Sequence, residues 1–229
     1  MVRNSLVLSG AVAAVVGLAG TAHAVLFTAT DGSAQVDITT TPNGSNTDLH
    51  IALTNLTTAD GTASAGNLLT GLELIPTDIS TFSLTAQNGA QEFVFSTATT
   101  GAVSSGSFDP SWALVTSPGH SLYFDGFGSG GKPIIGGPAT GGTNYNNANA
   151  SLTSGPHGPY IYETGDFTVQ APGVFDVNSI TNVNFLFNTD GSIVVPGVPN
   201  LGPGTPEPAS LSVLALGTMG LLIRKRRCA

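Results

Sequence analysis

Four acidic residues could supply the pair of carboxylates that glycoside hydrolysis requires. Asp109, Asp125, Glu163 and Asp166 are the candidates, one acting as the acid and another as the base or nucleophile. Such a pair must lie about 5–10 Å apart, and the sequence alone does not bring any two of them together. A secreted hydrolase is therefore one hypothesis for function, with no assigned catalytic residue.

Other signals for catalysis or metal binding are weaker. His50, His120 and His157 occur singly, as surface or turn histidines do, and neither G-x-S-x-G nor H-E-x-x-H occurs. Asp31 and Asp190 each begin an Asp-Gly-Ser triplet, which predicts a turn. A calcium site built from these turns is an alternative, although the spacing is not that of an EF-hand. We expect no catalytic residue, no metal site and no cofactor, with calcium left open.

One glycine-rich segment is similar in spacing to phosphate-binding loops. Residues 126–133 satisfy G-x-G-x-x-G and nearly satisfy the P-loop pattern, but Pro133 replaces the Ser or Thr that would hold magnesium. Two glycines and Pro138 follow, and they oppose the helix whose N-terminus would bind the phosphates. Nucleotide binding is therefore not predicted.

The elements between the two ends of the chain read as β-strands. Short runs of alternating apolar and polar residues are separated by Gly, Asn, Asp or Pro, and no stretch from Val25 to Thr205 has a helical apolar stripe. Asn88-Gly89 between two such runs is the strongest hairpin signal. We predict an all-β domain over 25–195, a β-sandwich with a jelly roll as one arrangement. The inward positions include Val36, Ile38, Leu49, Ile51, Leu53, Phe82, Leu84, Phe93, Phe95, Phe167, Val169, Val183, Phe185 and Phe187.

Two segments of low complexity interrupt or follow this domain. Residues 125–160 are rich in Gly, Asn and Pro and predict a long loop, which is either disordered or functional. In a binding role, three tyrosines could stack on sugar rings and four asparagines could bind hydroxyls. Residues 196–205 predict a Gly/Pro linker. The tyrosines and asparagines in or beside the long loop are Tyr145, Tyr160, Tyr162, Asn144, Asn146, Asn147 and Asn149.

The first 24 residues have the features of a secretory signal peptide. Arg3 precedes an apolar run from Leu6 to Ala19, and Ala22 and Ala24 flank His23 as a small-x-small cleavage site. A first transmembrane helix is the alternative, but the run is short. Cleavage after Ala24 would make Val25 the mature N-terminus, and the Sec translocon would be the export partner.

The distribution of charge agrees with export. Apart from Arg3 and a C-terminal block of four cations, Lys132 is the single basic residue, while all 14 acidic residues lie between Asp31 and Glu207. The intervening portion thus has a formal charge of −13. Such a surface repels nucleic acid phosphates, so no nucleic acid partner is expected. The one cysteine, Cys228, lies beyond the basic block, which excludes an internal disulfide.

The C-terminal 24 residues combine three elements in a fixed order. Pro206, Glu207 and Pro208 precede a chargeless apolar stretch, and four cations follow it, namely Arg224, Lys225, Arg226 and Arg227. The stretch from Ala209 to Ile223 would span about 22 Å as a helix, less than a hydrocarbon core of about 30 Å. Snorkelling by the cations relieves part of this mismatch. A short, transient membrane helix is predicted, with a plain tail anchor as the alternative.

This order of elements resembles the PEP-CTERM sorting signal of exported bacterial proteins. The resemblance covers about a tenth of the chain, and Cys228-Ala229 after the basic block is a small departure. It implies that an exosortase, a membrane transpeptidase, removes the tail at the Pro206-Glu207-Pro208 motif. It also implies an inner-membrane intermediate, then the cell surface or extracellular matrix of a Gram-negative bacterium.

Three functional classes follow. The first is a non-enzymatic surface or matrix protein associated with extracellular polysaccharide or biofilm, as the resemblance implies. The second is a carbohydrate- or calcium-binding module, which an aromatic platform or a cluster of three carboxylate oxygens would favour. The third is the secreted glycoside hydrolase.

Overall fold

A computed structural model describes residues 23–58, 65–76, 82–95, 101–108, 111–117, 121–125, 134–138 and 160–200. These residues are almost entirely β-strand, with two single turns of 3-10 helix, η1 (Ala65–Asn67) and η2 (Val177–Ser179). The all-β prediction is therefore confirmed. No helix within these ranges is long and apolar enough to cross a membrane. The predicted sorting signal and nearly all of the predicted signal peptide lie outside the described residues.

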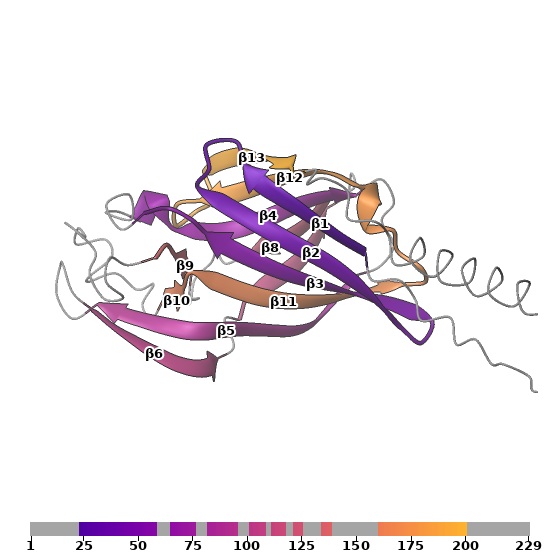
Figure 1. Cartoon of the computed structure of the whole chain (residues 1–229), viewed down its shortest axis with the longest axis horizontal. Coiled ribbons are helices and arrows are strands. Elements are labelled where there is room, and N and C mark those ends of the chain that lie inside the picture. Colours follow the sequence, from indigo (N-terminus) through magenta and orange to yellow (C-terminus); the bar gives the residue numbers. More distant parts are fainter. Residues whose placement is uncertain are drawn as a thin grey trace, which may run out of the picture.

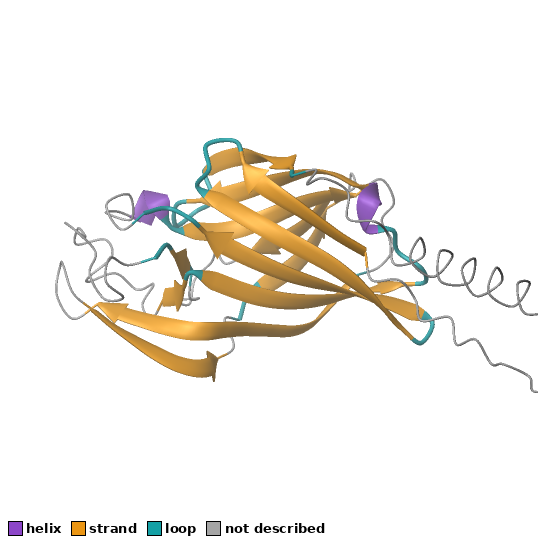
Figure 2. Ribbon diagram, in the orientation of Figure 1, coloured by secondary structure: helices purple, strands orange, loops and turns teal. Residues whose placement is uncertain are grey.

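Thirteen strands form one hydrogen-bonded sheet (Figure 1, Figure 2). They are β1 (His23–Ala29), β2 (Ala34–Asn43), β3 (Asn46–Asn55), β4 (Leu69–Pro76), β5 (Ser83–Phe95), β6 (Gly101–Phe108), β7 (Ala113–Ser117), β8 (Ser121–Asp125), β9 (Ile135–Gly136), β10 (Tyr160–Tyr162), β11 (Thr164–Pro172), β12 (Ile180–Phe187) and β13 (Ile193–Pro199).

The sheet closes on itself in a barrel-like arrangement. Ten strands follow one another in the order β12-β13-β1-β2-β3-β11-β5-β10-β9-β4, and β4 pairs back onto β12 along almost its whole length. Strand β8 pairs with β4 and carries β7, while β6 pairs with β5. The sandwich predicted from the sequence is not confirmed, because these strands form one closed sheet rather than two packed sheets.

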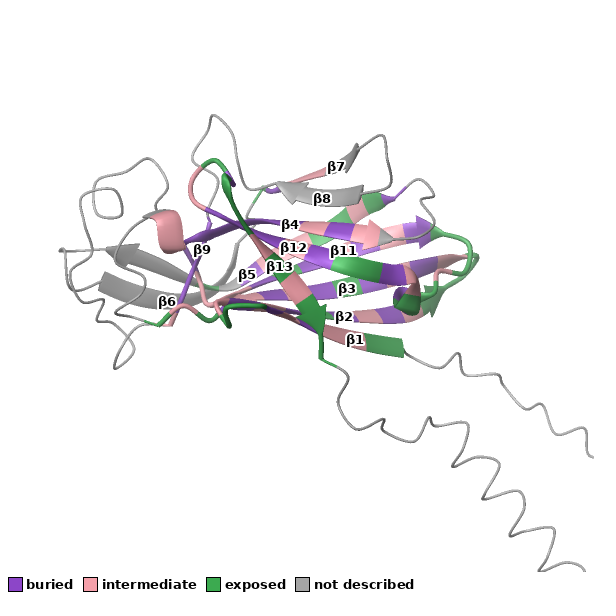
Figure 3. Cartoon of the chain, turned by 90° about the horizontal axis from the view of Figure 1, so that it is seen from above, coloured by how far each residue is buried: buried purple, intermediate pink, exposed green. Residues whose placement is uncertain are grey.

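The interior of this sheet is the hydrophobic core. Along β1, β2, β3 and β11, buried residues alternate with more exposed neighbours (Figure 3). Each fully buried Leu, Ile or Phe side chain stabilises the fold by about 1.5–3 kcal/mol. Eleven of the predicted inward positions are at most 6% exposed, namely Val36, Ile38, Leu49, Ile51, Leu53, Phe82, Phe167, Val169, Val183, Phe185 and Phe187.

The two Asp-Gly-Ser triplets form turns as predicted. The aspartate side chain accepts a hydrogen bond from the serine backbone N–H, at 2.9 Å from Ser33 to Asp31 and at 3.0 Å from Ser192 to Asp190. The central glycines have φ of +76° at Gly32 and +66° at Gly191, which explains the residue type. Both turns lie at one end of the sheet, between β1 and β2 and between β12 and β13.

The predicted hairpin at Asn88-Gly89 is wrong. Both residues lie inside the long strand β5, where Asn88 pairs with Asp166 and Gly89 with Gly165 of β11. A different Asn-Gly pair makes a hairpin: Asn43 ends β2, and Gly44 follows with φ of +63° before β3 begins. Pairing with β11 thus overrides the local turn preference at Asn88.

The predicted linker and long loop also need correction. Strand β13 continues to Pro199, so residues 196–199 belong to the sheet and not to a linker. Within 125–160, residues 134–138 are described, and Ile134 and Ile135 are at most 1% exposed. Ile135 begins β9, so this part of the predicted loop is a structural element. Strands β10 and β11 are separated at Glu163, which has φ of +63°.

Candidate functional site

Three neighbouring strands present a polar surface on the outside of the sheet. The register sets Asp37 of β2 and Asp166 of β11 on either side of Ala52 in β3. In the next outward row, Thr39 and Thr168 stand on either side of His50. Strands β2, β3 and β11 pair continuously over nine or ten residues, so they hold these six side chains in a fixed array.

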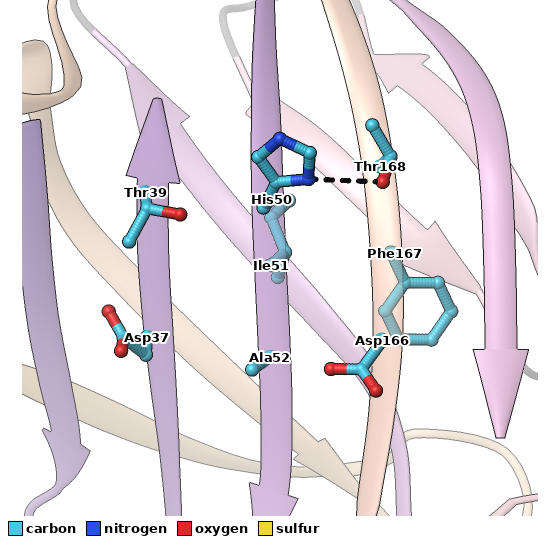
Figure 4. A pocket seen from close by; sticks show the side chains of 8 residues that line it. All are labelled: Asp37, Thr39, His50, Ile51, Ala52, Asp166, Phe167 and Thr168. Atoms are coloured by element: carbon cyan, nitrogen blue, oxygen red, sulfur yellow. Dashed lines mark hydrogen bonds between the residues drawn. The ribbon is translucent and has the colours of Figure 1, made fainter. Parts of the chain in front are cut away.

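A shallow open hollow of about 300 Å³ lies on this surface (Figure 4). Ala52 explains the depression, because its methyl side chain is much shorter than those of Asp37 and Asp166 on its two sides. The residues that line the hollow are Asp37, Thr39, His50, Ile51, Ala52, Asp166, Phe167 and Thr168. Ile51 and Phe167 are at most 2% exposed and belong to the core beneath, so the polar side chains make the accessible wall.

His50 is held by hydroxyl groups on both sides. Its Nε2 lies 3.1 Å from Oγ1 of Thr41, and its Nδ1 lies 3.4 Å from Oγ1 of Thr168. Farther along the same face, Asp48 accepts hydrogen bonds from Nδ2 of Asn43 at 2.8 Å and Nε2 of Gln170 at 3.0 Å. These contacts fix the orientation of the polar side chains beside the hollow.

Partial burial changes the electrostatic environment of Asp166 in the hollow. Desolvation by partial burial raises the pKa of Asp166 above its usual value. The part of the chain that the structure describes contains no Lys or Arg that could oppose this effect. The Cα atoms of Asp37 and Asp166, two strands apart, are separated by about 10 Å.

This arrangement suits a ligand rich in hydroxyl groups. Carboxylates accept hydrogen bonds from hydroxyls, and the threonines can both donate and accept. The described residues contain no group of three or more His, Cys, Asp or Glu that could hold a metal ion. The hollow also brings together two carboxylates, the residue type that glycoside hydrolysis needs, although it is open rather than a cleft.

The structure brings some of the sequence candidates together and separates others. Asp166 and His50 meet in the hollow, whereas Glu163 lies at the break between β10 and β11 and is not among its lining residues. Asp125 ends β8, which is not adjacent to this surface. Asp109, His120 and His157 lie outside the described residues. Sequence reasoning missed Asp37, whose outward position follows from its alternation with the buried Val36 and Ile38.

The proposed aromatic platform is not supported at Tyr160. This side chain is 2% exposed, and its burial raises its pKa to about 12, so it is not available to stack on a sugar. Tyr162 is half-buried at the end of β10. The other members of the predicted platform, Tyr145 and the four asparagines, lie outside the described residues.

The predicted sorting and cleavage residues are mostly outside the described ranges. These are Ala22, Pro206, Glu207, Pro208, Arg224, Lys225, Arg226 and Arg227. Ala24 is described, and with His23 it forms the exposed start of β1, paired with Thr39 and Thr40 of β2.

Comparison with known proteins assigns no family. No protein-family model, no curated protein and no solved structure matches this chain.

Proposed function

We propose that this chain is a non-enzymatic exported protein of the cell surface or extracellular matrix. In this proposal residues 1–24 are a signal peptide, residues 206–229 are a PEP-CTERM sorting signal with a short transmembrane helix, and an exosortase removes the tail. The resemblance of the tail residues and the charge distribution are the main support. A Gram-negative host and association with extracellular polysaccharide belong to the same proposal.

One structural observation supports it: the sorting motif lies beyond the last strand that the structure describes, β13. Strand β13 ends at Pro199, and Asn200 makes one more backbone hydrogen bond, from its N–H to the carbonyl of Leu26 at 2.7 Å. Pro206 follows six residues later. A cut within or after Pro206-Glu207-Pro208 would therefore remove none of the strands that the structure describes.

The intact mass of the exported protein tests this proposal. We expect a mass that lacks both the signal peptide and the segment after the motif. Glu207→Ala should prevent removal of the tail, while Thr205→Ala, in the same segment but outside the motif, should be processed normally. A mass that retains Arg224 to Ala229 in the unchanged protein would show a simple anchor and overturn the sorting role.

The hollow between Asp37 and Asp166 is the proposed site for polysaccharide. Because the exported portion has a formal charge of −13, we expect neutral rather than acidic polysaccharides to bind. Asp37→Asn together with Ala52→Leu, which fills the hollow, should weaken retention on an immobilised neutral polysaccharide. Asp31→Asn is the matched control, because it changes an exposed aspartate at a turn. Equal retention of all three proteins would rule out this site.

A secreted hydrolase is the second candidate. The observation that favours it is that Asp37 and Asp166 line the same hollow, where burial raises the pKa of Asp166. Release of reducing ends from a neutral polysaccharide, abolished by either Asp→Asn change, would establish it. Binding without release would favour the non-enzymatic function.

A further inference from the structure

We propose that one defined end of the sheet contacts the membrane while the two apolar flanking segments are attached to the domain. This inference rests on the proposed function, because that function places the flanking segments in the membrane. The end concerned, called the exit end below, comprises the start of β1, the end of β13, the hairpin 43–46 and the loop 172–175. The polysaccharide hollow then remains exposed above the membrane surface.

The pairing of the first and last strands defines the exit end. Strands β1 and β13 are antiparallel neighbours, with Phe27 opposite Pro199 and Ala29 opposite Gly197 (Figure 1). The chain therefore enters β1 and leaves β13 at the same end of the sheet. Asn200 bonds to Leu26, three residues from His23, so the entry and exit points are about 10 Å apart along the strand.

Short connections keep this end close to both apolar segments. The predicted run Leu6–Ala19 ends three residues before His23, and the predicted membrane segment begins at Ala209, nine residues after Asn200. At a maximum of about 3.5 Å per residue, these connections reach about 10–15 Å and about 30 Å. With both apolar segments attached, the shorter N-terminal connection limits how far the domain can lie from the membrane surface. The opposite end of the sheet therefore cannot turn toward the lipid.

The exit end has a surface that suits contact with lipid. Val174 is 101% exposed in the loop between β11 and η2, and the N–H of the preceding Gly173 donates to the carbonyl of Ser45 in the hairpin, at 3.1 Å. Val198, near the end of β13, is 50% exposed. The carboxylates nearby, Asp48 and Asp176, accept hydrogen bonds from neighbouring residues. Because the described residues include no Lys or Arg that could bind an anionic headgroup, the contact should not depend on anionic lipid.

The opposite end also has exposed apolar side chains, so exposure alone does not select the exit end. Leu56, Ile193 and Val194 are 37–52% exposed there, beside the Asp31 and Asp190 turns. The strand directions decide between the two ends, because β1 is entered and β13 is left at the exit end alone. Asp37 lies seven residues from Gly44 of the exit end, or about 23 Å, so the hollow stands clear of the membrane.

Two exposed valines at opposite ends provide a matched test. Full-length chains with Cys228→Ser would carry either Val174→Cys or Val194→Cys, labelled with an environment-sensitive fluorophore. Both would be added to phosphatidylcholine vesicles that contain spin-labelled quencher lipids. Flotation of the vesicles would first show whether the chain is bound. We expect quenching and a blue shift for the label at position 174 and neither change at position 194, at low and high salt.

The outcomes separate this inference from the proposed function. Failure to float with vesicles would remove both, because the membrane segments would then be wrong. Flotation with equal quenching at the two positions, or with stronger quenching at 194, would overturn the orientation alone.

A variant with both apolar segments disabled serves as the control. Val15→Arg places a charge in the N-terminal run, and Leu216→Arg places one in the middle of the apolar tail. In the full-length chain the two changes together should abolish flotation and the quenching at position 174. Persistent quenching there would show that the two segments do not orient the domain.

Discussion

Two sides of the sheet are built in different ways. On one side β2, β3 and β11 pair without interruption over nine or ten residues, and these three strands are called the continuous wall here. On the other side the ring is completed through β4, β9, β10 and β5, called the closing side. There β9 has two residues, and its link to β4 is the single pair Leu69–Ile135.

On the closing side, side-chain hydrogen bonds supply links that the short strands do not make through their backbones. Asn55, which is 0% exposed, donates from Nδ2 to the carbonyls of Asn67 at 3.0 Å and Ile135 at 2.8 Å. Its Oδ1 accepts from the N–H of Thr57 at 2.9 Å. The side-chain amide of Gln87 in β5 makes a similar link to the residue before β7, since its Oε1 accepts from the N–H of Trp112 at 2.8 Å.

The difference separates the residues that stabilise the closed sheet from the residues that form the candidate site. The continuous wall is held by backbone pairing that tolerates changes in outward side chains, so its polar residues are free to form a site. The closing side depends on a few buried polar groups, each of which costs free energy when it loses its partners. Mutations on the two sides should therefore have unequal effects.

The largest effect is expected for Asn55→Ala. This change removes three hydrogen bonds from a fully buried position and should lower the free energy of unfolding by about 3–5 kcal/mol. Urea unfolding measures it. Thr54→Ala is the control on the neighbouring outward position, where the hydroxyl bonds to Oγ1 of Thr164 at 2.9 Å, and it should cost less than about 1 kcal/mol. Similar losses for both variants would contradict the distinction between the two sides.

Tyr160 on the closing side should make stability depend on alkaline pH. Its folded pKa of about 12 lies above the usual value of 10.0, so the stabilising difference is complete below pH 10. It is lost as the pH rises toward 12, because the unfolded phenol ionises first, and the loss approaches about 3 kcal/mol. Unfolding measured at several pH values should show a smaller decline in Tyr160→Phe. An equal decline in both proteins would assign the effect to other groups.

A smaller effect is expected for Gln87→Ala. The buried N–H of Trp112 loses its acceptor, which should cost about 1–2 kcal/mol. Trp112 is 2% exposed and packs against Phe167 with ring centroids 5.0 Å apart, so its fluorescence reports on the loosened contact. Gln87→Glu keeps an acceptor for this N–H and should retain more stability than Gln87→Ala. The reverse order would show that the hydrogen bond is not what closes β5 against β7.

The smallest effect is expected on the continuous wall, for Asp166→Asn. Because burial raises the folded pKa of Asp166, its favourable contribution is present at low pH and is lost as the pH rises through the folded pKa. At neutral pH the asparagine variant should therefore be slightly more stable than the unchanged protein. The two should converge at low pH, where the carboxyl group is protonated in both the folded and the unfolded chain. A variant that is less stable at neutral pH would contradict the direction of this shift.

The sequence predicted local structure better than it predicted pairing. Alternation placed Val36, Ile38 and Phe167 inside correctly, because inward and outward positions follow from the strand period alone. The two Asn-Gly pairs show the limit. Asn43-Gly44 makes a hairpin, but Asn88-Gly89 pairs with β11, and the partner of a strand distant in sequence is not encoded by the local turn preference.

The candidate site was only partly predictable for the same reason. The sequence identified Asp166 and His50 as separate candidates and did not identify Asp37. Alternation places each of these three side chains on the outer face of the sheet. They come together only because β3 lies between β2 and β11. In the sequence, β11 follows β3 only after the long segment that contains β4 to β10. The depression at Ala52 likewise requires the register of all three strands.

The adjacency of β1 and β13 has a consequence for the order of folding. The sheet cannot close between its first and last strands until almost the whole domain has been synthesised and has emerged, since Phe27 pairs with Pro199. Such long-range pairing makes folding slow, and incomplete sheets present unpaired edges that aggregate. In the export that we propose, the chain would reach the far side of the membrane with β1 able to pair with β2 but not yet with β13.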